Sequence, residues 1–112
     1  MVKSINDMIG AVIFDFVEIH DYKQIVTDKG IINLYNPVRC YLQHGDSMSF
    51  MKALKISSNH VITRIVLETN EHLIFEICDK IIVDLSLNTD ECLGSEAASI
   101  HFDTGETMVV QN

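Results

Sequence analysis

The chain has 112 residues, of which 47% are hydrophobic and 21% charged, and its 16 acidic and 8 basic residues give a formal net charge of −8. This length suits a single domain over residues 1–112, and the hydrophobic content excludes a disordered acidic tail. The surplus of carboxylates argues against nucleic acid and anionic membranes as direct ligands, because both are bound through Lys and Arg. It favours a basic protein as the partner.

Residues 12–20 and residues 28–34 are the first two segments with a strand-like pattern of apolar residues. These segments match residues 61–69 and 79–85 at offsets of 49 and 51. We interpret the chain as two copies of a strand–strand–strand unit. The alternative is chance, since any two β meanders rich in Ile and Val look alike.

A connection follows the first unit. Asn36-Pro37 ends that unit, because Pro37 is the only proline and has no N–H to donate to a sheet ladder. We expect a turn at His44-Gly45-Asp46-Ser47 and then a short helix through Leu54, capped by Ser47 or Ser49.

The clearest β pattern consists of three segments in which most odd positions are apolar, while Arg64, Glu68, Glu76, Asp84 and Ser86 fall on even positions. These segments are residues 61–69, 73–78 and 81–87. Each is expected to form a strand with one dry and one wet face. The three-residue loops between them keep the odd positions on the same face, which predicts a three-strand meander.

The last part of the chain is expected to form one helical turn at residues 88–93 and then a hairpin. Its arms are residues 98–102 and 108–110, joined by Asp103-Thr104-Gly105. The pattern predicts about eight short strands and one or two short helices. The expected fold is therefore mainly β, with tandem antiparallel β-meanders forming a two-sheet sandwich or a flattened barrel.

Residues with catalytic or metal-binding chemistry are scattered along the chain. Cys40, Cys78 and Cys92 form no CxxC pair, and we expect reduced thiols in a cytoplasmic protein. Acidic neighbours disfavour the thiolate at Cys78 and Cys92, and Cys40 beside Arg39 is the least unfavourable nucleophile. Five histidines lie outside any metal-binding motif: His20, His44, His60, His72 and His101. We expect no enzyme activity, no metal and no cofactor.

The net negative charge comes entirely from the second half of the sequence. Residues 1–59 contain six acids and six bases, whereas residues 60–112 contain ten acids and two bases. In the predicted meander, Glu68, Glu76 and Asp84 share the wet face. This is either a solvated face that keeps the protein soluble or a docking face for a cationic protein. The candidate contacts are Glu68, Glu71, Glu76, Asp79 and Asp84, with a second cluster of Asp90, Glu91 and Glu96.

A family resemblance covers nearly the whole chain. The residues that carry it are Met8-Ile9-Gly10, Asn36-Pro37, Leu85-Ser86-Leu87-Asn88, Gly94-Ser95-Glu96-Ala97-Ala98, Asp103-Thr104-Gly105 and Val109-Val110. This frame resembles small bacterial β proteins that include immunity proteins of contact-dependent growth inhibition and related polymorphic toxin systems, although Ser95 stands where a proline is expected. The resemblance implies a cytoplasmic protein that neutralises one cognate toxin C-terminal domain, often a nuclease, and it carries over no catalytic residue.

The sequence is therefore consistent with two functions. The first is stoichiometric inhibition of a basic nuclease, which acts on RNA or DNA, through an acidic surface. The second is a non-catalytic assembly module that forms a homodimer through an exposed β edge, with residues 98–101 and the hairpin after them as the candidate edge. A small enzyme or ligand-binding barrel would require a polar-lined cavity.

Overall fold

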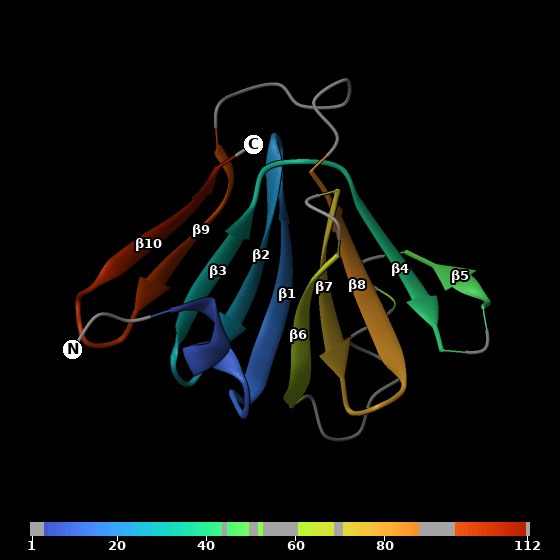
Figure 1. Ribbon diagram of the computed structural model, residues 1–112, viewed down its shortest axis with the longest axis horizontal. Coiled ribbons are helices and arrows are strands. Elements are labelled where there is room, and N and C mark those ends of the chain that lie inside the picture. The colour runs from blue at the N-terminus through green and yellow to red at the C-terminus, as the bar shows by residue number, and fades with distance from the viewer. Residues whose placement is uncertain are drawn as a thin grey trace.

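The computed structural model describes residues 4–43, 45–49, 52, 61–68, 71–87 and 96–111. Ten strands in this part of the chain form two antiparallel sheets (Figure 1). Sheet 1 contains β1 (Ile13–Ile19), β2 (Tyr22–Thr27), β3 (Gly30–Leu34), β9 (Glu96–Phe102) and β10 (Thr107–Gln111), in the order β1-β2-β3-β9-β10. Sheet 2 contains β4 (Val38–Leu42), β5 (Ser47–Met48), β6 (Ile62–Glu68), β7 (His72–Ile77) and β8 (Ile81–Ser86), in the order β5-β4-β8-β7-β6. The predicted mainly β, two-sheet fold is confirmed.

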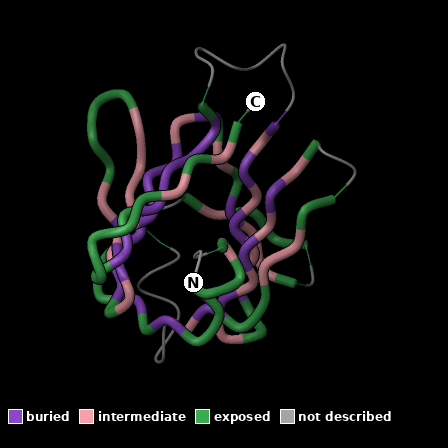
Figure 2. Tube along the Cα trace, turned by 60° about the vertical axis from the view of Figure 1, so that its left-hand side comes forward, coloured by how far each residue is buried: buried purple, intermediate pink, exposed green. Residues whose placement is uncertain are grey.

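The two sheets share one hydrophobic core, which appears as the buried stretches of the chain in Figure 2. Phe16, Ile25 and Ile32 from sheet 1 and Phe75 and Val83 from sheet 2 are all at most 1% exposed. Each such side chain contributes roughly 1.5–3 kcal/mol through its removal from water. The core therefore fixes which face of each sheet remains outside.

A short 3-10 helix, η1 (Ile5–Met8), adds to this core before β1 begins. Its last residue, Met8, is fully buried. The turn after η1 is tied to sheet 2, because Gly10 N–H donates to the Ile62 carbonyl at 2.7 Å and Ile62 N–H donates to the Ala11 carbonyl at 3.0 Å. The start of the chain thus links the two sheets.

The internal repeat predicted from the sequence is visible in the strand pairing. Strands β1-β2-β3 and β6-β7-β8 are both antiparallel meanders. Both first strands carry a bulge at the equivalent residue, Phe14 in β1 and Thr63 in β6, which are 49 positions apart. Val12 and Val61, also 49 positions apart, pair with each other in an antiparallel bridge. The two units are therefore related by an approximate two-fold axis.

Each sheet contains the three-strand meander of one unit and the two-strand hairpin that comes after the other unit in the sequence. The β4–β5 hairpin follows the first meander but pairs with β8, and the β9–β10 hairpin follows the second meander but pairs with β3. The two turns match, since Gly45 and Gly105 have φ values of 107° and 94°, and their N–H groups donate to Leu42 and Phe102 at 2.8 and 3.0 Å. This exchange interlocks the two units. The β4–β5 hairpin accounts for the two strands beyond the eight that the sequence pattern predicted.

The bulge in β6 corrects one detail of the predicted meander. Val61 and Thr63 were expected on the dry face, but Ile62 is fully buried and Thr63 is exposed. One extra residue in a strand inverts the alternation on one side of it. Ile65 and Leu67 pair with the buried residues Phe75 and Leu73, as the predicted alternation requires, but Leu67, which was expected on the dry face, is 57% exposed.

The predicted helix near residue 50 is only partly within the described residues. Ser47 lies in β5, so its predicted capping role is wrong. Ser49 Oγ accepts a hydrogen bond from Lys52 N–H at 3.2 Å, as a capping side chain does. The rest of this helix and the predicted helical turn at residues 88–93 lie outside the described residues.

Among the described strands, four form the edges of the two sheets: β1 and β10 in sheet 1, and β5 and β6 in sheet 2. Residues 98–101, which were predicted to form an exposed edge, lie inside sheet 1. They belong to β9, which pairs with β3 on one side and β10 on the other. That part of the prediction is wrong because β9 is covered by a strand from the other repeat. The hairpin after it does supply an edge, β10.

The β7–β8 turn holds two non-glycine residues in the left-handed region, Cys78 and Asp79, each with a φ of 56°. This conformation costs an L-residue about 1 kcal/mol, and glycine relieves most of that cost while adding entropy to the unfolded chain. We expect Asp79→Gly to stabilise the protein by about 0.5 kcal/mol, measured from its urea unfolding midpoint. Asp103→Gly, in a turn where the native φ is negative, is the control and is expected to destabilise. Equal losses in both variants would contradict the prediction.

Candidate functional site

The outer face of sheet 2 gathers side chains from four strands. The pairing register places them in three cross-strand rows. The first row is Tyr41, Ile82, Glu76 and Arg64, the second is Arg39, Asp84, Ile74 and Val66, and the third is Ser86, His72 and Glu68. We call these residues the sheet 2 face.

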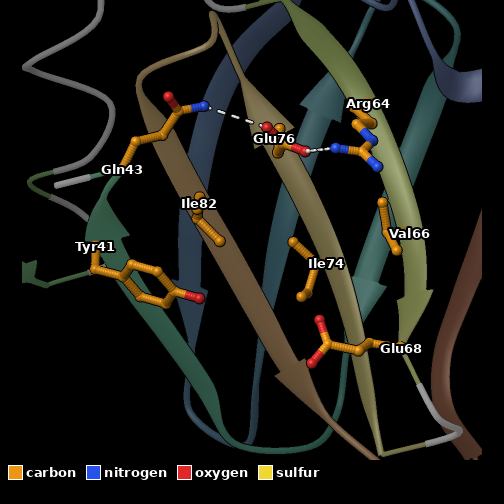
Figure 3. A pocket seen from close by; sticks show the side chains of 8 residues that line it. All are labelled: Tyr41, Gln43, Arg64, Val66, Glu68, Ile74, Glu76 and Ile82. Carbon is orange, nitrogen blue, oxygen red and sulfur yellow. Dashed lines mark hydrogen bonds and ion pairs between the residues drawn. The ribbon is translucent and has the colours of Figure 1, made fainter. Parts of the chain in front are cut away.

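A hollow of about 420 Å³ lies on the sheet 2 face (Figure 3). Its lining residues are Tyr41, Gln43, Arg64, Val66, Glu68, Ile74, Glu76 and Ile82. Three aliphatic side chains occupy its middle, while charged and polar groups surround them. Protein-binding surfaces have the same arrangement, with an apolar centre inside a polar rim.

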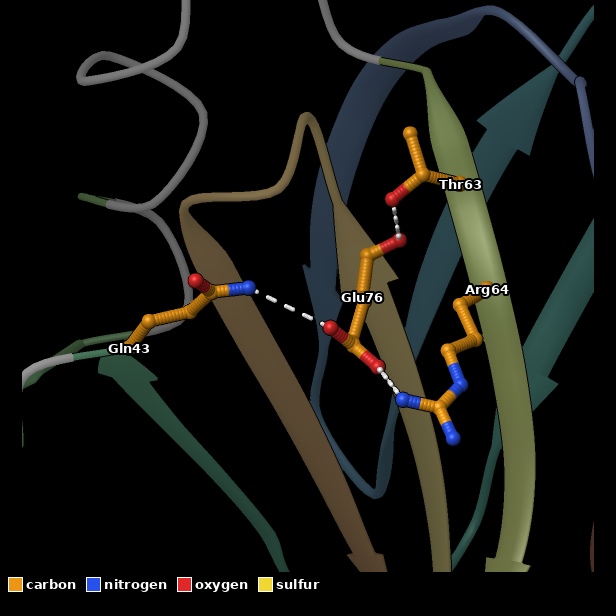
Figure 4. Close-up of polar contacts among 4 residues, drawn as sticks. All are labelled: Gln43, Thr63, Arg64 and Glu76. Carbon is orange, nitrogen blue, oxygen red and sulfur yellow. Dashed lines mark hydrogen bonds and ion pairs between the residues drawn. The ribbon is translucent and has the colours of Figure 1, made fainter.

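Glu76 is held in place by its neighbours (Figure 4). Its Oε1 accepts a hydrogen bond from Gln43 Nε2 at 3.2 Å, and its Oε2 pairs with Arg64 Nη1 at 3.2 Å. Thr63 Oγ1 donates to its backbone carbonyl at 3.1 Å. The Glu76 side chain is 16% exposed and that of Arg64 is 67% exposed. An ion pair this exposed adds little stability, but the paired donors fix the direction of the carboxylate.

The other two carboxylates of the face, those of Asp84 and Glu68, differ in whether they have a hydrogen-bond partner. Asp84 Oδ1 lies 2.9 Å from His72 Nδ1, and Arg39 lies opposite Asp84 in the register. Glu68 is exposed, and in the described part of the chain its carboxylate has no hydrogen bond or ion pair. Glu68 is therefore the carboxylate of this face that is available to a partner.

Tyr41 adds a hydrogen-bond donor to the same hollow. Burial, together with the negative charges of Asp84 and Glu68, raises the pKa of the Tyr41 phenol above its ordinary value. The phenol therefore stays protonated at neutral pH and keeps its proton to donate.

The structure groups only some of the predicted contact residues. Glu68, Glu76 and Asp84 share the sheet 2 face, as predicted. Glu71 and Asp79 lie in the turns at opposite ends of β7. Glu96 is exposed at the start of β9, in sheet 1, so it does not adjoin the other candidates. Asp90 and Glu91 lie outside the described residues.

The sheet 2 face is less acidic than the sequence predicted. Arg39 and Arg64 alternate with its three carboxylates. The exchanged β9–β10 hairpin also carries Asp103 and Glu106 to sheet 1, which spreads the acids of the second half over both sheets. Tyr41 and Arg39 were not among the predicted site residues, because no strand was predicted at residues 38–42. The alternation of apolar residues at positions 38, 40 and 42 is the signal that would have found them.

Neither a metal site nor a membrane-spanning helix is found among the described residues. No three His, Cys, Asp or Glu side chains among them are close enough to hold a metal ion. No helix among them has the length and apolar character needed to cross a bilayer.

Cys40, which the sequence offered as the least unfavourable nucleophile, is 3% exposed. Burial raises the pKa of its thiol from 9.0 to about 12, so almost no thiolate exists at neutral pH. The folded state holds this proton more tightly than the unfolded state, so folding stability falls as pH rises above the unfolded pKa. We expect a loss of about 1.4 kcal/mol per pH unit above about pH 9.

The measurement is urea unfolding between pH 8 and pH 10.5. Cys40→Ala is expected to be less stable at pH 8, because it leaves a small cavity, and to lose less stability as pH rises. Cys78→Ala is the control and should keep the slope of the native chain. Parallel losses in Cys40→Ala and the native chain would show that another group titrates.

Comparison of the chain with protein-family models, curated protein sequences and solved structures finds no match.

Proposed function

We propose that this chain is a non-catalytic binding protein that neutralises a cognate toxin domain of a contact-dependent growth inhibition or related polymorphic toxin system. It acts in the cytoplasm of the cell that makes it and docks through the sheet 2 face. The observation that carries the proposal is the hollow on the outer face of sheet 2, where aliphatic side chains are surrounded by polar and charged groups that include Glu68 and Glu76.

Each part of the face suits a cationic protein partner. Desolvation of aliphatic and aromatic groups at the centre supplies most of the affinity of a protein interface. Carboxylates at the rim select a basic partner and raise the association rate, and the net charge of −8 adds long-range attraction. A toxin that cleaves RNA or DNA must present basic surface to its substrate, so an acidic inhibitor that covers this surface blocks it.

The hollow favours a long cationic side chain as the anchoring group of the partner. The stem of an arginine lies well against aliphatic side chains such as Ile74 and Val66. Its guanidinium then pairs with the free carboxylate of Glu68, while Tyr41 donates to a neighbouring acceptor. Glu76 is already held by Gln43 and Arg64 and serves as a fixed part of the rim.

The direct test is coexpression with the product of the gene immediately upstream, followed by capture through a tag on either protein at low salt. The expected result is a 1:1 complex in which the catalytic activity of the partner is lost. Absence of a toxin gene at this position, or absence of a complex at low salt, would refute the proposal.

Charge reversal at Glu68 tests the docking face itself. Glu68→Lys is expected to slow association with the toxin domain about tenfold at low salt, with a smaller effect as salt rises, because rim charges act mainly on the association rate. Glu106→Lys, in the β9–β10 turn of sheet 1, changes the net charge equally and is the control. Stopped-flow kinetics measure both rates. Equal slowing would mean that only the overall charge matters.

A further inference from the structure

The four edge strands differ in how well they are protected against pairing with another strand. β1 and β6 each contain a bulge and charged residues, and β5 has two residues. Bulges, charges and short length are the usual means by which proteins block edge-to-edge association. β10 has five residues with the sequence TMVVQ, which contains neither a charge nor a proline. The one register shift in its ladder places the extra residue, Ala97, on β9, so β10 itself is regular.

Among the described residues, the backbone of β10 has no hydrogen-bond partner on its outer side. Phe102 N–H donates to the Glu106 carbonyl at 2.9 Å, so the backbone groups of Glu106 point toward β9. These directions alternate along an antiparallel strand, so Thr107, Val109 and Gln111 turn their N–H and C=O groups away from β9. This strand is therefore a template for one more antiparallel strand.

We propose that two copies of this chain associate through β10, antiparallel about a two-fold axis at Val109, so that their two copies of sheet 1 form one continuous sheet. In this register Val109 opposes Val109 of the second copy, Thr107 opposes Gln111, and Met108 opposes Val110. Valine and threonine favour strands, and opposed valines on neighbouring strands stabilise the pairing. Met108 and Val110 are half-buried against the core, and the second copy covers them further.

The absence of charge on β10 favours a second copy of this chain as the partner that pairs with it. Two chains that each carry −8 meet favourably only where neither presents charge. β10 meets this condition, and so does the outer cross-strand row of sheet 1 that ends on it: Val17, Gln24, Asn33, Ser99 and Val109. A two-fold interface requires only that one strand complement itself. A cationic protein is drawn instead to the carboxylates of sheet 2.

The proposed dimer does not depend on the toxin. β10 lies at the far edge of sheet 1 from sheet 2 (Figure 1), so each copy keeps its sheet 2 face open. The dimer would therefore hold two toxin domains.

The test measures the mass of the isolated chain by sedimentation equilibrium from micromolar to millimolar concentration. We expect twice the 12.7 kDa monomer mass for the native chain. Val109→Lys and Val109→Glu should each weaken association at least tenfold, because each places two like charges opposite one another. An equal mixture of the two variants should recover the dimer, since opposite charges then face each other. Val17→Lys, at the other end of the same row, is the control and should associate like the native chain.

Three results would overturn the proposal. The first is a native chain that remains monomeric at millimolar concentration. The second is a Val109→Lys variant that dimerises as well as the native chain, or a mixture that associates no better than either variant alone. The third is amide protection of residues 107–111 that appears only when the toxin domain is bound, which would make the occupant a strand of the toxin. Circular dichroism of each variant establishes that the chain remains folded.

Discussion

Gly30→Ala is expected to destabilise the protein by roughly 3 kcal/mol or more, which is a large part of the stability of a small domain. Gly30 begins β3 with a φ of 147°, a region that L side chains rarely adopt. A Cβ at this position would lie 2.3 Å from the His101 carbonyl oxygen and 2.9 Å from Phe102 Cα. Both are backbone atoms of β9, so relief would require β3 and β9 to separate at the place where the hairpin of one repeat joins the meander of the other.

Gly105→Ala is the matched control, because it also has a positive φ, of 94°, but a Cβ there meets nothing within 4 Å. Its expected cost is about 1 kcal/mol, from backbone strain alone. Urea unfolding of both variants gives the two free energies of unfolding. Similar losses would show that backbone conformation, and not the close approach of β9, decides the effect at Gly30.

The local part of the fold was predictable from the sequence. In β7 and β8, Leu73, Phe75, Val83 and Leu85 alternate with polar or half-exposed residues, and all four are at most 2% exposed. Local alternation is sufficient here because the two strands are neighbours in both the sequence and the sheet. The match between residues 12–20 and 61–69 also predicted the repeat.

The non-local part of the fold was not predictable in the same way. A bulge at Phe14 or Thr63 adds one residue with no mark in the pattern, and this shifts the buried side by one position. The exchange of hairpins depends on which distant strand β4 and β9 pair with, and periodicity contains no information about strand partners. The position of Arg39 opposite Asp84, which lowers the negative charge of the sheet 2 face, follows from that exchange.

The carboxylates of the candidate site were predicted from the sequence, but its apolar centre was not. Even positions in three adjacent strands placed Glu68, Glu76 and Asp84 on one face because hairpin loops preserve the register. Ile74 and Ile82 also occupy even positions, so the same alternation places them on the outer face, where they form the middle of the hollow. Their position in the alternation, and not their residue type, is what separates them from core residues.

The strongest expected effect on the proposed function comes from that apolar centre. Val66→Arg places a cation in the hollow, where it repels a cationic partner and competes for the carboxylates of the rim. We expect the dissociation constant for the toxin domain to rise on the order of 100-fold, or about 2.7 kcal/mol. Val17→Arg is the control, since Val17 is the equivalent residue of the first repeat, 49 positions earlier, and is also half-buried on the outer face of an edge strand. Isothermal titration calorimetry measures the dissociation constants of both variants, and equal losses of affinity would place the docking surface elsewhere.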